Sequence, residues 1–240
     1  MLLQNLSFNG WLNGITALLC VLFAGGFGLF MAFQSKKQKS NLLLYGGLMG
    51  FFAGMFWLGP TLDFLLVLFT GENLPSPEIW GILTFIWPGP ALVTSMWVGG
   101  EVVLTKKKKK LLVVIAIIIA IVYEAILIFD TSGALRDYGD PGGVELYDIS
   151  FEIGHPIFIA VILMFGMLFV FCGMGALNQG LKTAGAIKKR FIYLSIAFFL
   201  FIFVCAVDAF FEVVQIVVLV RGLMIFVASL MYLSLRIKVV

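Results

Sequence analysis

Asp208-Ala-Phe-Phe-Glu-Val-Val-Gln-Ile-Val-Val-Leu-Val-Arg221 places two acids, an amide and an arginine inside an apolar run that extends from Phe191 to Arg236. As one helix, that run would be about 69 Å long at a rise of ~1.5 Å per residue. The hydrocarbon core of a bilayer is only ~30 Å thick. The run must therefore fold back on itself. Glu212 and Gln215 mark the expected turn.

The composition is that of an integral membrane protein. Of the 240 residues, 62% are hydrophobic and 12% are charged, and the mean hydropathy is +1.10, far from the values of an ordinary soluble domain. Apolar runs long enough to cross a bilayer recur along the chain. We expect an all-α bundle of seven transmembrane helices, in one domain, at the plasma membrane. The expected spans are near 11–33, 42–69, 79–104, 111–129, 156–177, 191–211 and 216–235.

Two proline motifs interrupt these spans. Gly59-Pro60 removes a backbone hydrogen bond and is expected to kink the second span just before Asp63. Trp87-Pro88-Gly89-Pro90 can break the third span, which is tolerated at membrane depth only where protein or a polar cavity supplies hydrogen-bond partners. Alternatively, the third helix begins after Pro90 and the preceding residues lie at the interface.

The basic residues indicate an orientation. All of the 16 lysines and arginines except Arg136 and Arg221 fall in the loops after the first, third and fifth spans or at the C-terminus. Because short basic loops stay in the cytoplasm, we expect the N-terminus outside and the C-terminus inside. Lys106–Lys110 is expected to contact anionic lipid headgroups rather than nucleic acid. The acidic connection 130–155 is expected to form an extracellular loop or lid, in which 144–151 can be a short interfacial helix.

Several charged side chains are expected at similar depths in the outer half of the bundle. A charge inside a span is costly, so it is by default paired or functional. If these side chains face inward, they form one polar pocket that opens to the outside. The candidate ligand- or ion-binding residues are Asp63, Glu124, His155, Asp208, Glu212 and Arg221.

The last two spans hold three of these candidates. Asp208 and Glu212 are four residues apart, which places them on one helical face, and Arg221 can reach either acid across the hairpin. One interpretation is an ion pair that holds the last two helices together. The other is a ligand or ion site, because a single pair leaves Asp63 and Glu124 without a cation. Unpaired acids at that depth suit proton coupling or cation binding.

The other candidates each have two interpretations. Glu124, which follows Tyr123 in an aliphatic helix, either lines the pocket or forms a hydrogen bond between helices, and the same alternatives apply to Asp63. His155, just before Pro156, is either a solvated or capping residue at the interface or an external pH sensor.

Enzyme signatures are missing from the sequence. One histidine does not suffice for the zinc site of a seven-span hydrolase. No G-x-S-x-G-like nucleophile lies in a span, and Asp63 and Asp208 lack the sequence context of the paired aspartates in presenilin-like proteases. We therefore expect that the protein is not an enzyme and that it holds no cofactor or metal ion.

The predicted topology is similar to that of the rhodopsins and G-protein-coupled receptors, but the similarity does not extend to motifs. No span contains a lysine that could bind retinal. The third span lacks Asp-Arg-Tyr at its inner end, and the seventh lacks Asn-Pro-x-x-Tyr. The sequence therefore indicates no membership of either family.

Three function hypotheses follow. The first is a sensor or receptor-like protein that binds a small ligand or cation in the outer pocket. The second is a proton- or cation-coupled transporter or channel, which ranks lower because the inner half offers only Glu101 as a further acid. The third is a structural subunit or homo-oligomer that assembles through Gly46, Gly50 and Gly54, whose spacing of four residues allows close approach of a neighbouring backbone.

Overall fold

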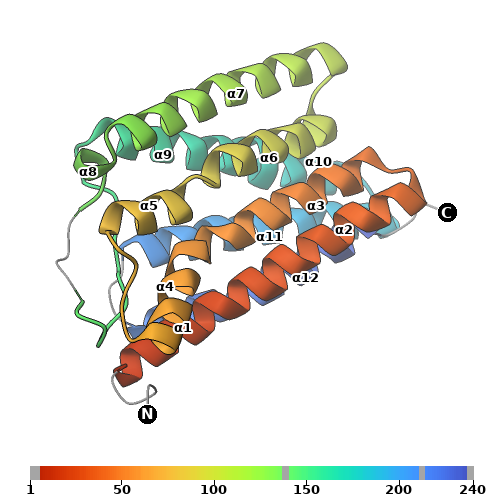
Figure 1. Ribbon diagram of the computed structural model, residues 1–240. Coiled ribbons are helices and arrows are strands. Elements are labelled where there is room, and N and C mark those ends of the chain that lie inside the picture. Colours follow the sequence, from red (N-terminus) through yellow and green to blue (C-terminus); the bar gives the residue numbers. More distant parts are fainter. Residues whose placement is uncertain (1–5, 137–140, 211–213, 237–240) are drawn as a thin grey trace.

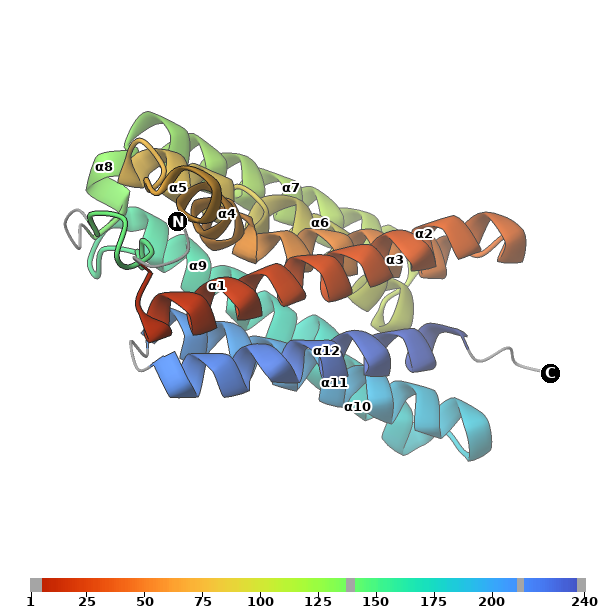
Figure 2. The same ribbon diagram turned by 60° about the horizontal axis from the view of Figure 1, so that its bottom comes forward.

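The protein is all-helical in the computed structural model, which describes residues 6–136, 141–210 and 214–236. Seven helical segments are long and apolar enough to cross a membrane, which confirms the expected fold class. The first and last of them lie side by side, so the bundle closes on itself (Figures 1 and 2). The segments are Phe8–Gln38, Asn41–Thr70, Pro77–Val103, Lys106–Phe129, Pro156–Lys182, Gly185–Asp208 and Val218–Leu235.

Four of the spans contain shorter elements, which include π-helical (η1, η3) and 3-10 (η2) turns. The elements are α1 (Phe8–Cys20), η1 (Val21–Gly25), α2 (Gly26–Gln38), α3 (Asn41–Gly54), η2 (Met55–Trp57), α4 (Leu58–Thr70), α5 (Pro77–Phe85), α6 (Pro88–Val103), α7 (Lys106–Phe129), α8 (Thr131–Ala134), α9 (Pro156–Met167), η3 (Leu168–Met174), α10 (Gly175–Lys182), α11 (Gly185–Phe210) and α12 (Val214–Arg236).

The second span bends where Pro60 predicts it. Because proline has no N–H, it cannot donate to the carbonyl four residues earlier, and the helix tightens into the 3-10 turn η2 before α4 begins. Figure 1 shows that α4 leaves η2 in a different direction from α3. The bend places Trp57 in the centre of the bundle, where it is 2% exposed.

The third span is broken at Ile86–Trp87, and α6 begins at Pro88 rather than after Pro90. The backbone carbonyls at the break receive side-chain donors, as a break at membrane depth requires. The hydroxyl of Tyr123 on α7 donates to Phe85 O (2.6 Å), and Trp87 Nε1 donates to Leu83 O (2.8 Å). The expected break in the third span is therefore confirmed, and the alternative start after Pro90 is wrong.

The glycines of the second span pack within the chain. A Cβ on Gly54 would overlap the backbone nitrogen of Gly25, and one on Gly47 would lie 2.5 Å from Ala32 N. Gly50 lies against Gly28, and Gly46 lies under the Leu235 side chain of α12. The close backbone approach is confirmed, but the partners are α2, η1 and α12 of the same chain. This face therefore gives no support to assembly with a second copy.

We predict that Gly54→Val lowers stability by about 1–3 kcal/mol, the usual cost of overpacking, because the added atoms meet backbone that cannot rotate away. Gly26→Ala is the matched control, since a Cβ there meets nothing within 4 Å. Thermal denaturation in detergent should separate the two variants, and equal melting temperatures would contradict the close packing of η1 against α3.

The two ends of the bundle differ in charge. The loop 39–40, the junction 104–105 and the loop 183–184 lie beside lysines at the end of the bundle where α12 ends, which we call the basic end (Figure 1). The loop 71–76 and the described residues 130–136 and 141–155 lie at the other end, the acidic end. The described part of 141–155 contains no helix, so the expected interfacial helix at 144–151 does not form. Instead, Ser7 N donates to Val144 O (2.8 Å) and Arg136 N donates to Ser150 O (3.0 Å).

Candidate functional site

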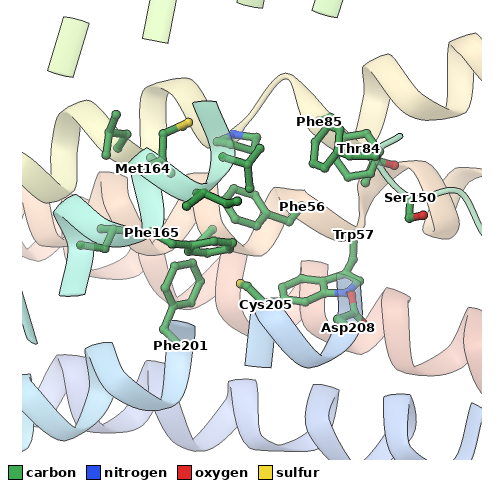
Figure 3. Close-up of a pocket in the computed structure, with 18 of the residues that line it drawn as sticks. Phe56, Trp57, Thr84, Phe85, Ser150, Met164, Phe165, Phe201, Cys205 and Asp208 are labelled. Atoms are coloured by element: carbon green, nitrogen blue, oxygen red, sulfur yellow. The ribbon is translucent and has the colours of Figure 1, made fainter. Parts of the chain in front are cut away.

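A cavity of about 270 Å³ lies inside the bundle near the acidic end (Figure 3). Residues of α3 to α6, α9, α11 and α12 surround it, and Asp148–Phe151 of the acidic-end loop line it from outside. Its volume is at the lower limit of ligand pockets, which run from about 300 to 1,000 Å³. We call it the aromatic cavity. Its aromatic lining residues are Phe56, Trp57, Trp80, Phe85, Phe151, Phe158, Phe165, Phe198 and Phe201.

The cavity has a polar part and an apolar part. Figure 3 shows Thr84, Ser150 and Asp208 on one side, with Trp57 beside Asp208, and Met164, Phe165 and Phe201 on the other. The polar side lies toward the acidic end, because Ser150 belongs to the loop and Asp208 stands near the end of α11. A ligand that fills the cavity would therefore be apolar over most of its length and polar at one end.

Asp208 is hydrogen-bonded through both carboxylate oxygens. Arg221 Nε on α12 donates to Oδ1 (2.9 Å), and Trp57 Nε1 donates to Oδ2 (2.8 Å). The bend at η2 presents the indole, and the hairpin of α11 and α12 presents the guanidinium. The interpretation of Asp208 and Arg221 as an ion pair between the last two helices is confirmed.

Arg221 also joins the first span. Its Nη1 donates to the backbone oxygen of Asn13 (3.2 Å) and to the Asn13 side-chain oxygen. The arginine is 5% exposed and lines the cavity. Within the described part of the chain, its Nη2 donates no hydrogen bond. Arg221 therefore connects α1, α11 and α12 and still has an unused donor nitrogen.

Asp63 holds the acidic-end loops. It is fully buried and accepts hydrogen bonds from Leu74 N (2.8 Å), Tyr147 N (2.9 Å) and Asn73 Nδ2 (3.0 Å). Asn73 in turn donates to Glu145 O (3.0 Å) and accepts from Gly143 N (2.7 Å). Asp63 does not line the aromatic cavity. Its contacts position the loop whose next residues cover that cavity.

Glu124 and His155 lie apart from this cavity. Glu124 packs against the backbone of Gly89 on α6, and it has no hydrogen bond or ion pair with another described residue. His155 caps α9, since its Nδ1 accepts from Ile157 N (3.3 Å), and its Nε2 lies 3.2 Å from Asp130 Oδ2. The capping interpretation of His155 is thus confirmed.

Of the candidate residues, the structure brings only Asp208 and Arg221 together at the cavity. Asp63, Glu124 and His155 occupy separate places at the acidic end, and Glu212 lies outside the described residues. The expectation of one shared pocket fails for these three because their side chains point to different neighbours. Asn13 and the aromatic lining were not predicted. A polar residue inside the first span was the available signal for Asn13.

A smaller cavity of about 180 Å³ lies at the basic end. Glu101 and Arg190 line it, together with Leu194 on α11 and Leu235 on α12. Glu101 forms an ion pair with Lys109, and the Lys109 ammonium lies 4.3 Å from the ring centre of Trp97.

No protein-family model matches the chain, and no curated protein matches it. Any assignment of function must therefore come from the geometry of the cavity.

Proposed function

We propose that the protein is a receptor-like sensor of the plasma membrane that binds a small ligand in the aromatic cavity. Its N-terminus faces outside and its C-terminus faces the cytoplasm, because the loops of the basic end follow the positive-inside rule. Lys106–Lys108 and Lys110 are exposed at that end and contact anionic lipid headgroups. The role is binding rather than catalysis.

The observation that carries the proposal is the position of the ion pair in the cavity wall. Asp208 and Arg221 line the cavity and also fix the first, sixth and seventh spans to one another. A ligand that changes these contacts would bind one arrangement of the three spans more tightly than another. Such a difference in affinity is what a conformational response to the ligand requires. The seventh span, α12, continues to the basic end, where Arg190 Nε donates to Ser234 O (2.9 Å).

We predict that Ala91→Phe abolishes ligand retention. Ala91 on α6 lines the cavity and is 6% exposed, so a phenyl ring there occupies the space of a ligand. Small molecules that remain with the protein after purification from native membranes are compared by mass spectrometry. A species that stays with the wild type and is lost by at least about tenfold in the variant, equivalent to ~1.4 kcal/mol of binding, supports the proposal.

The control for this experiment is Ile159→Phe, which changes an exposed residue of α9 that does not line the cavity. Both variants must melt within a few degrees of the wild type. Identical small-molecule profiles in wild type and Ala91→Phe would contradict the proposal.

A second candidate function, transport, is favoured by the position of the basic-end cavity. Phe198 and Met231 line the aromatic cavity, whereas Leu194 and Leu235, one helical turn further along, line the other. The two cavities reach toward each other from opposite ends of the bundle, and a layer of apolar side chains separates them. This arrangement suits a transporter that opens to one side of the membrane at a time. Proton or cation flux in liposomes that is lost in Asp208→Asn would favour transport over sensing.

A further inference from the structure

We propose that the ligand of the aromatic cavity is a short single-chain amphiphile with an uncharged, hydrogen-bond-accepting head, which enters from the membrane between α9 and α11. The inference rests on the proposed function and names the class of ligand and its route. Three observations carry it: the apolar residues at the edge of the cavity, the separation of two helices, and the charges and unused donor at the polar end.

Ile162 places an opening of the cavity at membrane depth. It lines the cavity and is also 53% exposed on the outer surface of α9. It stands six residues after Pro156, which is about 9 Å along the helix and within the apolar span Pro156–Lys182. An apolar side chain that is exposed at this depth faces lipid chains. The edge of the cavity at Ile162 therefore faces lipid rather than water.

The helices around this edge separate toward the acidic end. At the basic end, η3 and α10 pack closely against α11, and Ser195 on α11 donates to Gly173 O (2.9 Å) in η3. Further along, α9 and α11 have no such close packing, and the cavity lies between them. One face of α9 lines the cavity from Phe158 to Phe165 at helical spacing, and Leu168 at the start of η3 continues it. The two helices thus form a wedge-shaped gap, closed at the basic end.

The charges at the polar end favour an uncharged head. The charged lining residues within the described chain are two arginines and two aspartates, Arg136, Arg221, Asp148 and Asp208, so their formal charges cancel. A charged head would place an uncompensated charge beside Arg221, which is 5% exposed, and burying such a charge is costly. An uncharged acceptor meets the unused Nη2 of Arg221 without that cost.

The volume of the cavity sets the size of the probe. At about 270 Å³ it is comparable to a small ligand pocket. An eight-carbon alcohol is a single-chain amphiphile that such a cavity accommodates. Its hydroxyl would lie beside Arg221, which lines the cavity. Its chain would extend along Phe165 and Phe201, which lie on the apolar side (Figure 3).

The test uses an eight-carbon alcohol with a photoreactive diazirine at its terminal carbon, added to the protein in liposomes. Irradiation followed by peptide mass spectrometry should locate the label at Met164, Phe165 or Phe201. Unlabelled 1-octanol should compete at least about tenfold better than octanoate or n-octane at equal mole fraction in the membrane. Arg221→Lys, which keeps the charge and removes Nη2, should reduce this preference for the alcohol over the alkane.

The route is tested by the rate of labelling after rapid mixing. Ile162→Trp should slow the appearance of the label on the order of tenfold, whereas Ile159→Trp, an exposed neighbour outside the cavity, should leave it within twofold. Equal rates in both variants would overturn entry between α9 and α11. Octanoate competing as well as 1-octanol would overturn the uncharged head.

Label at lipid-facing residues alone would overturn the ligand class. If Ala91→Phe nevertheless loses a molecule that the wild type retains, the proposed function stands and only the ligand class is wrong. If Ala91→Phe loses no such molecule, both proposals fail.

Discussion

Replacing Arg221 with leucine is expected to lower the free energy of unfolding by about 3–5 kcal/mol, the cost of removing one partner from a buried ion pair. Arg221 is 5% exposed, and Asp208 would keep only its hydrogen bond from Trp57. The same change removes the hydrogen bonds from Arg221 on α12 to Asn13 on α1. Denaturation by SDS in mixed micelles measures the loss.

A double-mutant cycle separates the ion pair from the packing of the arginine. Asp208→Asn alone keeps the size of the side chain, and Asp208→Asn combined with Arg221→Leu leaves neither charge unpaired. The double variant should be more stable than Arg221→Leu, because the uncompensated carboxylate is gone. Arg221→Leu within about 1 kcal/mol of the wild type, with ligand retention lost, would instead show that the arginine serves binding and not stability.

The spans could be predicted because a membrane imposes one length and one polarity on each helix. The reversal between 191 and 236 followed from length, and α11 ends at Phe210 while α12 begins at Val214, so Gln215 lies in α12 and not in the turn as expected. The bend at η2 followed from Pro60, since a missing N–H acts wherever it occurs. These are local constraints that do not depend on which helices are neighbours.

Which residues line the cavity depends on which helices pack against one another, so the lining could not be predicted in the same way. Depth along a span is readable from the sequence, but the direction in which a side chain points around the helix depends on packing. The sequence predicts similar depths for Asp63 and Asp208, yet Asp63 accepts from the loops and Asp208 accepts from Arg221. Aromatic residues are frequent throughout the chain, so nothing in the pattern distinguished Phe165 or Phe201 as cavity residues.

The loop that covers the cavity is expected to loosen when Asp63 is replaced by asparagine. Asp63 Oδ1 accepts from Leu74 N, and Oδ2 accepts from Asn73 Nδ2 and Tyr147 N. An amide has one NH₂ group, which must face an N–H donor on one side or the other. With hydrogen bonds to a charged group contributing about 1.5–3 kcal/mol each, the amides of Leu74 and Tyr147 should exchange with solvent on the order of a hundredfold faster.

The exchange measurement separates a local effect from global unfolding. Amides in the middle of α7 should keep their protection in Asp63→Asn, because α7 supplies none of the hydrogen-bond donors to Asp63 in the described part of the chain. Glu72→Gln is the control, since Glu72 is an exposed carboxylate in the same loop.

A cysteine introduced as Ser150→Cys reports on the cavity itself, because Ser150 lines it. Loosening should let a water-soluble thiol reagent react faster at that position. Unchanged reactivity together with fast exchange at Tyr147 would mean that Asp63 orders the loop without controlling access to the cavity.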